Sequence, residues 1–402
     1  LMARSEVFSR TVLVYLASRF ALGTATMMLR SAIAWHVFAL THSPFHLGLI
    51  GLVQFLPAFA LTLVAGALAD SNDRRRIMMT SQVVTFTCGL ILFVATVKGT
   101  VGLGLLYGIV GVAAIASAFD SPARMAFLPS LIARVHFPRV ATIASTNQAL
   151  AFATGPALGG LLIADFGISA AYAAYTGLII VAFIALALLP SPPSAPSGRG
   201  VSLAVIREGV AFVRSRPVVF GCMTLDMFAV IFGGATALLP VYASDILHVG
   251  PRGYGLLSSA LELGALMTSI ALITLPPIRH AGRALMCAVG VYGLATIVFG
   301  LSRSFPLSLA AYMLVGVADQ ISVVMRSTAI QLSTPDELRG RVSAVNLLFI
   351  GASNQLGAAE SGFLAAATSA TFAVVSGGIA SLVVLGIVAL TIPALRDYRI
   401  DG

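Results

Sequence analysis

Long apolar runs make up most of the chain, and each is bounded by glycine, proline or charged residues. Runs of about 20 residues have the length that an α-helix needs to cross a membrane. The pattern predicts twelve spanning helices, near residues 10–38, 45–69, 76–97, 101–121, 139–164, 168–189, 217–244, 251–275, 282–301, 305–327, 340–366 and 369–393. We therefore expect an all-α integral membrane protein.

Composition supports this reading and excludes several classes. Of the 402 residues, 58% are hydrophobic and 10% are charged, whereas soluble domains carry about 25% charged residues. A soluble globular domain, a disordered chain and a disulfide-rich secreted scaffold are therefore excluded. The three cysteines lie inside apolar runs, so no disulfide is expected.

The basic residues predict the orientation in the membrane. The chain has a net charge of +9, and with a cytoplasmic N-terminus only Lys98, Arg252 and Arg303 fall in outer loops, while most arginines fall at inner ends and loops. The positive-inside rule then predicts a multi-pass protein of the bacterial inner membrane with both termini cytoplasmic. The charge needs no nucleic-acid partner, and no cleavable signal peptide is expected because the first apolar run is too long.

Two similar halves are predicted. Residues 1–189 form the first six-helix half and 217–402 the second, joined by a cytoplasmic linker at 190–216. The linker begins with PSPPSAPSGRG and continues into an amphipathic helix with Leu203, Ile206, Val210 and Val213 on one face. Arg124 and Arg139 recur with the same spacing as Arg326 and Arg341, which indicates duplicated halves.

The loop after the second predicted helix reads GALADSNDRRR. By itself, this loop is a cytoplasmic stop signal with local ion pairs. It also resembles the signature between helices 2 and 3 of the major facilitator superfamily, with Ser71 and Asp73 in place of the usual arginine and glycine. The resemblance implies that fold, with two pseudo-symmetric halves, and a cytoplasmic gate formed by Gly66, Asp70, Asp73, Arg74, Arg75 and, at the inner end of the fourth helix, Asp120.

Two further stretches resemble the enterobactin-exporter and macrolide-efflux branch of the drug:proton antiporters: DSPARMAFLPSL at 120–131 and STPDELRGRV at 333–342. The fifth helix also carries Gly155, Pro156, Gly159 and Gly160, which resemble the motif associated with antiporters. Small residues permit close helix contact and proline bends a helix, so plain packing is the alternative reading of this motif.

Six charged residues are predicted inside the membrane, where an unpaired charge costs about 3 kcal/mol or more; they are Arg19, Arg30, Asp226, Glu262, Asp319 and Glu360. Arg19 and Arg30 lie within about 20° of one face of the first helix, which is expected to line the cavity. Asp226 and Arg19 occupy equivalent repeat positions, so an ion pair between the halves is expected. Glu262 is the first choice for a proton carrier, with Arg30 as its partner or as an anion site. The alternative for each carboxylate is a static ion pair.

Polar residues in the fifth and eleventh helices are candidate substrate contacts, and hydrogen bonds between helices are the alternative; these residues are Asn147, Gln148, Asn354 and Gln355. No phosphate-binding loop and no metal-ligand pattern is present in the sequence. We therefore expect no metal, no cofactor and no enzymatic activity, with the proton gradient as the energy source.

The sequence predicts a secondary transporter that exports drug-like amphiphiles or siderophores in exchange for protons by alternating access. Its expected partners are a small-molecule substrate, protons and membrane lipids, and the expected state is a monomer. Two alternatives stay open: an importer or uniporter of the same fold without proton coupling, and a non-transporting membrane receptor.

Overall fold

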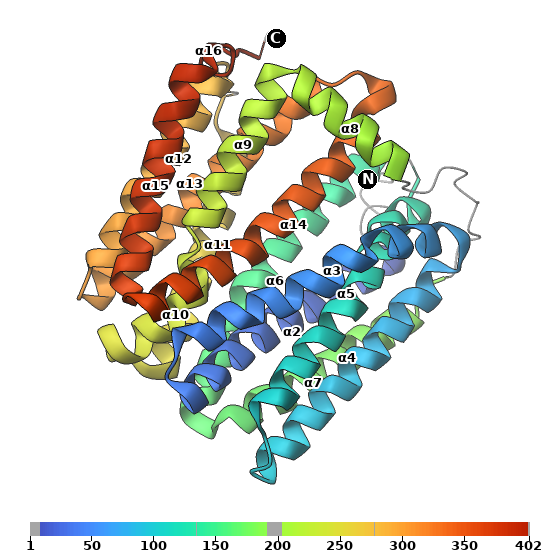
Figure 1. Cartoon of the computed structure of the whole chain (residues 1–402). Helices are drawn as coiled ribbons and strands as arrows, with labels where there is room; N and C mark the ends of the chain where they lie inside the picture. Colours follow the sequence, from blue (N-terminus) through green and yellow to red (C-terminus); the bar gives the residue numbers. More distant parts are fainter. Residues whose placement is uncertain (1–8, 134, 191–202, 277, 401–402) are drawn as a thin grey trace. The chain divides into compact units, whose positions relative to one another are not determined.

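The computed structural model describes residues 9–133, 135–190, 203–276 and 278–400, which contain helices and no strand. The first six helices are α2 (Arg10–Thr41), α3 (Pro44–Ser71), α4 (Arg74–Val97), α5 (Leu103–Leu131), α6 (Phe137–Phe166) and α7 (Ile168–Ala187) (Figure 1). The remainder are α8 (Leu203–Ser215), α9 (Pro217–Phe232), η1 (Ala235–Leu238), α10 (Leu239–Val241), η2 (Tyr242–Ile246), α11 (Gly250–Thr274), α12 (Ala281–Leu301), α13 (Phe305–Leu332), α14 (Asp336–Ala367), α15 (Ala370–Thr391) and α16 (Pro393–Arg396).

The predicted membrane helices are confirmed. Within the described residues, eleven spans are long and apolar enough to cross a membrane, and one of them joins α9 to the short helices that follow it. The remaining predicted span is α14, which has 32 residues but carries the polar side chains Asn354, Gln355 and Glu360 along its second half. The protein is therefore a multi-pass membrane protein.

Two helices extend beyond their predicted ends. Helix α5 continues from the predicted end at 121 to Leu131, through Pro122 and Pro129, and α13 continues from the predicted end at 327 to Leu332. Arg124 therefore lies inside a helix rather than in a loop, and Arg326 lies inside a helix as the predicted span implies. Prolines are tolerated in membrane helices where neighbouring groups satisfy the freed carbonyls, so the sequence breaker at Pro122 does not end α5.

The predicted span at 217–244 is confirmed as a candidate membrane span, Pro217–Ile246, but its helix is interrupted. Helix α9 ends at Phe232, a short 3₁₀ turn follows Gly233 and Gly234, and a π-helical turn covers Tyr242–Ile246. Adjacent glycines are a recognised cause of sharp helix kinks. Pro240, in α10, lacks the N–H that a continuous helix would use.

The described residues pack into two compact units, which comprise 9–37 with 56–190 and 38–55 with 203–400. We call these the N-terminal and C-terminal units. The division falls inside α2 and α3, so the segment 38–55 belongs to the C-terminal unit. There it packs on α14: the rings of Phe45 and Phe363 lie 5.1 Å apart.

In the N-terminal unit, α4 lies beside α5 and α7 (Figure 1). Helix α6 packs closely on α2 at Gly155, where an added Cβ would lie 2.6 Å from the carbonyl oxygen of Thr24 and 2.7 Å from the Cβ of Met27. A second contact ties the same helices together, because Asn147 donates a hydrogen bond to the carbonyl oxygen of Leu16 at 3.0 Å. The small residue at 155 therefore sets the α2–α6 distance.

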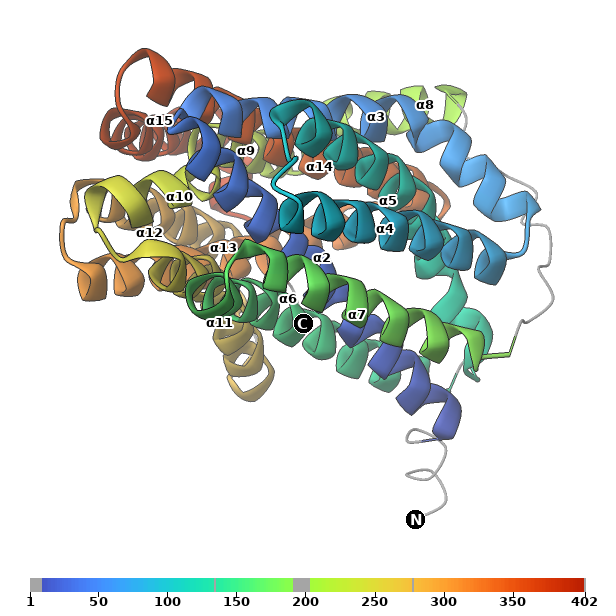
Figure 2. The ribbon, with the colours of Figure 1, turned by 90° about the horizontal axis from the view of Figure 1, so that it is seen from below.

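In the C-terminal unit, α12 lies beside α13 (Figure 2). The linker helix α8 packs on α14, where Glu208 and Arg341 form a 2.8 Å ion pair. A buried ion pair between Asp226 in α9 and Arg326 in α13 lies in this unit, with side chains 9% and 3% exposed. Apolar neighbours from the same turns, including Cys222, Leu225 and Met325, belong to one core cluster.

We predict that Gly155→Ala lowers the free energy of unfolding by about 1–3 kcal/mol, because the new methyl group overpacks against backbone. Thermal unfolding in detergent measures the effect. Gly177→Ala in α7 is the matched control, since a Cβ there meets no atom within 4 Å. Equal stability of the two variants would contradict the packing role of Gly155.

We predict that Asp226→Asn lowers the free energy of unfolding by about 3–5 kcal/mol, because Arg326 is left as an uncompensated buried charge. The double variant Asp226→Leu/Arg326→Met is expected to recover most of this loss, since an apolar pair of similar volume needs no counter-charge. Thermal unfolding of both variants tests this, and a double variant as unstable as Asp226→Asn would argue against it.

Candidate functional site

The gate motif ties the start of α4 to two neighbouring helices. Asp73 caps α4 by accepting a hydrogen bond from the backbone N–H of Arg75 at 2.9 Å. Arg74 donates to the carbonyl oxygen of Ala126 in α5 at 3.1 Å, and Arg75 donates to the carbonyl oxygens of Leu186 and Ala187 at the end of α7. Arginine at a helix C-terminus satisfies its last carbonyls and complements the helix dipole. The surroundings of Gly66 and the side chain of Asp70 lie outside what the structure describes.

Asp120, the fourth-helix member of the predicted gate, pairs with an arginine of its own helix. Both of its carboxylate oxygens accept hydrogen bonds from Arg124, each at 2.7 Å, across one turn of α5. The pair is largely buried, with side chains 16% and 11% exposed. This two-point bond uses the geometry that arginine and carboxylate favour. Among the described residues, Arg124 is thus the ion-pair partner of Asp120.

The two arginines of α2 differ in their surroundings. Arg19 is half-buried, and one of its terminal nitrogens donates to the Tyr15 hydroxyl at 3.2 Å. Arg30 is exposed, eleven residues further along nearly the same helix face. A charged side chain that is exposed in the middle of a membrane span faces water rather than lipid. This face of α2 therefore fits a water-filled passage.

Asp226 was expected to pair with Arg19, and the structure instead gives it a partner from its own unit. Arg326, which belongs to the same C-terminal unit, neutralises the charge of Asp226 by forming an ion pair with it. Arg326 falls within the predicted span 305–327, but no sequence pattern joined it to Asp226, which is one hundred residues away.

Two further carboxylates in membrane helices of the C-terminal unit share a neighbour. Glu262 in α11 and Asp319 in α13 are half-buried, and both interact electrostatically with Tyr312 in α13. The helices approach closely between them, because a Cβ on Gly316 would collide with the carbonyl group of Leu261, the residue before Glu262. Among the described residues, Asp319 forms no ion pair.

Tyrosines link these carboxylates to the interrupted helix. The Tyr312 hydroxyl bonds to Oγ1 of Thr236 in η1 at 2.8 Å. Tyr292 in α12, which also interacts electrostatically with Asp319, donates to the carbonyl oxygen of Gly233 at 3.1 Å. Sequence reasoning missed Tyr292, Tyr312 and Thr236, although the adjacent glycines at 233 and 234 were a signal for the break.

The remaining candidate residues have mostly local contacts. Glu360 is half-buried and accepts from the neighbouring Ser361 at 3.3 Å. Asn147 bonds to α2 and Asn354 bonds within its own helix at 3.0 Å, while Gln148 and Gln355 are half-buried. For Asn147, the alternative of a hydrogen bond between helices is the one observed.

The fifth-helix motif is buried throughout: Gly155, Pro156, Gly159 and Gly160 all lie in the interior. Gly159, like Gly155, packs against Met28 of α2. The motif therefore acts in helix packing in this structure, and a role in antiport stays a prediction.

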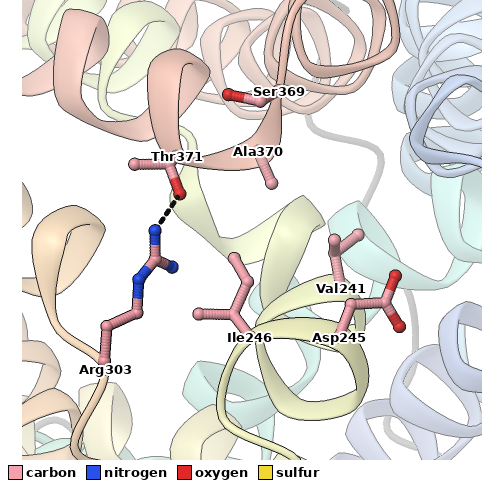
Figure 3. Close-up of a pocket in the computed structure, with 7 residues that line it drawn as sticks. All are labelled: Val241, Asp245, Ile246, Arg303, Ser369, Ala370 and Thr371. Atoms are coloured by element: carbon pink, nitrogen blue, oxygen red, sulfur yellow. Dashed lines mark hydrogen bonds between the residues drawn. The ribbon is translucent and has the colours of Figure 1, made fainter.

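A pocket of about 390 Å³ lies at one end of the C-terminal unit (Figure 3). Its lining comes from η2, the α12–α13 turn and the start of α15, and Arg303 donates to Thr371 there at 3.3 Å. Asp245, which carries the opposite charge, also lines the pocket, on the side of Ile246 away from Arg303 (Figure 3). The lining residues lie at helix ends, whereas Glu262 and Asp319 lie within spans, so this pocket is separate from the carboxylates. No group of three or more His, Cys, Asp or Glu side chains among the described residues is placed to hold a metal ion.

Comparison with known proteins places this geometry in a family. The model of a family described as "Transmembrane secretion effector" matches residues 4–399. The enterobactin exporter EntS of Citrobacter koseri is 26% identical, over 83% of this chain and 79% of its own length. EntS of Escherichia coli is 25% identical over the same shares of the two chains.

Solved structures show the same fold. The nucleoside transporter NupG superposes with a TM-score of 0.76 at 12% identity, covering 97% of this chain and 100% of its own. A bacterial homologue of the human lysosomal transporter Spinster gives a TM-score of 0.74 at 14% identity, covering 97% of this chain and 98% of its own. The chain is therefore a transporter rather than an enzyme, and it belongs to the transmembrane secretion effector family of the major facilitator superfamily.

Proposed function

We propose that this protein exports small molecules, either drug-like amphiphiles or siderophores, across the bacterial inner membrane in exchange for protons. Alternating access between two states moves the substrate, both termini lie in the cytoplasm, and the proton gradient supplies the energy without a cofactor. The name of the EntS relatives supports export and siderophores as one substrate class. The transporter works as a monomer with substrate, protons and lipids as its partners.

One observation supports the proton coupling: Asp319 lies in a membrane helix, forms no ion pair with any described residue, and interacts electrostatically with tyrosines that bond to the interrupted helix. An ionised carboxylate at membrane depth costs about 3 kcal/mol or more. Protonation removes this cost, so Asp319 is suited to take up and release a proton. Asp226 is less suited to carry a proton, because it forms an ion pair with Arg326.

Tyr292 transmits the protonation state of Asp319 to the interrupted helix. A phenol hydroxyl has one proton to donate, and Tyr292 gives it to the carbonyl oxygen of Gly233. An ionised Asp319 competes for this proton, whereas a neutral Asp319 does not. Loading Asp319 therefore favours the bond to Gly233, and unloading it weakens the hold of α12 on the break after α9. Discontinuous helices are common at the moving sites of secondary transporters.

Glu262 shares the electrostatic environment of Tyr312. We assign Asp319 the carrier role and Glu262 the role of its coupled neighbour.

An importer or uniporter of the same fold is the alternative. In that case, Asp319 and Glu262 bind cargo or brace helices, and substrate crosses without proton movement. A non-transporting receptor would bind ligand with no flux. Both alternatives are separated from the proposal by measuring substrate and protons together.

We predict that Asp319→Asn lowers substrate-triggered proton flux in proteoliposomes by about tenfold or more, because the neutral amide cannot exchange a proton. The assay imposes a pH gradient and adds siderophores, macrolides and lipophilic cations in turn. Glu262→Gln is expected to lower the flux less. Substrate transport by the wild type without any proton signal would exclude antiport, and full coupling in Asp319→Asn would remove Asp319 as carrier.

We predict that Tyr292→Phe weakens the acceleration of transport by the pH gradient while transport without a gradient continues. The reason is that the bond to Gly233 no longer responds to Asp319. Tyr242→Phe is the matched control, because Tyr242 also donates to a backbone carbonyl, that of Gly300, at 3.0 Å. An equal effect of both variants would mean that Tyr292 only stabilises the fold.

A further inference from the structure

We infer that Arg19, positioned by Tyr15 in the N-terminal unit, binds a carboxylate of the transported molecule. The inference rests on the proposed transport function and names the chemical class of its substrate. It starts from the charge balance of a small cluster formed by α2 and α5.

The cluster contains two arginines and one carboxylate. Arg124 uses both oxygens of Asp120, at 2.7 Å each, so that pair is complete. Arg19 donates one hydrogen bond, to the Tyr15 hydroxyl at 3.2 Å, and its Nε is buried without a hydrogen-bond partner. Among the described residues no carboxylate forms an ion pair with Arg19. One positive charge is therefore left over.

The guanidinium is held in place rather than mobile. Tyr15 is only 1% exposed and belongs to an apolar cluster with Phe127, whose ring lies 6.5 Å away, and with Met78 and Val140. Its hydroxyl is therefore fixed, and so is the nitrogen of Arg19 that donates to it. A fixed planar guanidinium with free donors matches the two oxygens of a carboxylate better than a flexible ammonium would.

The equivalent positions of the second half provide a contrast. The repeat places Asp226 at the position of Arg19 and Arg326 at that of Arg124, and there the two side chains pair with each other. At these two helix positions the C-terminal unit thus has a neutral ion pair, whereas the N-terminal unit has Arg19, which forms no ion pair among the described residues. A paired arginine is sufficient where the only role is helix packing, so the arginine without a carboxylate partner points to a ligand.

The position of Arg19 fits an anion that moves through the protein. Arg19 is nine residues after the start of α2, which is about 14 Å along the helix axis. The exposed Arg30 lies on nearly the same face and marks it as accessible to water. An anionic lipid headgroup is the competing source of the same oxygen chemistry, and the experiment separates the two.

The test measures how fast phenylglyoxal modifies Arg19 of the full chain in nanodiscs, with mass spectrometry of each arginine. The probes are 2-naphthoate and its uncharged amide, 2-naphthamide, in phosphatidylcholine and in phosphatidylglycerol nanodiscs. The exposed Arg10 of the same helix is the internal reference. We expect 2-naphthoate to slow the modification of Arg19 by about tenfold and 2-naphthamide to leave it unchanged, in both lipids.

Equal effects of acid and amide, or no effect of the acid, would overturn the inference. Protection by phosphatidylglycerol without any probe would overturn the assignment to the transported molecule and leave a lipid site.

Arg19→Gln and Arg19→Lys separate this inference from the proposed function. In proteoliposomes we expect Arg19→Gln to lose the preference for 2-naphthoate over 2-naphthamide and Arg19→Lys to keep part of it. Loss of this preference together with retained macrolide-driven proton flux in Arg19→Gln supports the inference. An unchanged preference would overturn it. A wild type that moves substrate without protons would instead contradict the proposed antiport, while the protection experiment still decides the role of Arg19.

Discussion

The cost of leaving a polar group unpartnered in hydrocarbon governs this structure. Backbone polar groups meet the constraint by forming helices, which satisfy their own hydrogen bonds. Side-chain charges must find partners from neighbouring helices, as Asp226 does with Arg326 and Asp120 with Arg124. Arg19 and Asp319 form no ion pair among the described residues. Because an unpaired charge inside a membrane carries a high free-energy cost, these two positions indicate function.

Arg19 and Asp319 lie in different units and have different roles in the proposed transport. The N-terminal unit holds an open cation and the C-terminal unit holds a carboxylate without an ion pair among the described residues. Under the proposed function, the cation of the N-terminal unit recognises an anionic substrate, and the carboxylate of the C-terminal unit exchanges a proton. The repeat predicted from the sequence aligns positions of the two halves whose charges differ. Arg19 and Asp226 illustrate this directly, because they occupy the same repeat position with opposite charge.

The interrupted helix connects Asp319 to movement. Gly233 and Gly234 interrupt the span, and the carbonyl oxygen of Gly233 accepts two hydrogen bonds, from the Ala235 N–H at 2.7 Å and from the Tyr292 hydroxyl at 3.1 Å. The backbone bond belongs to the local turn, whereas the tyrosine interacts electrostatically with Asp319. In the proposed mechanism, protonation of Asp319 therefore acts through the bond from Tyr292.

The sequence by itself determined the helices and the family resemblance, because hydrophobic runs and loop signatures are local properties of the chain. It located the eleven spans that the described residues confirm, and it identified Asp319 and Arg19 as charges inside membrane helices. Only the tertiary structure decided their partners. Arg326 is one hundred residues from Asp226, and Tyr292 is 59 residues from Gly233, so no local pattern joins them. The helix end near Pro122 was misjudged for the same reason, because neighbouring groups satisfy the carbonyls that a proline leaves without a partner.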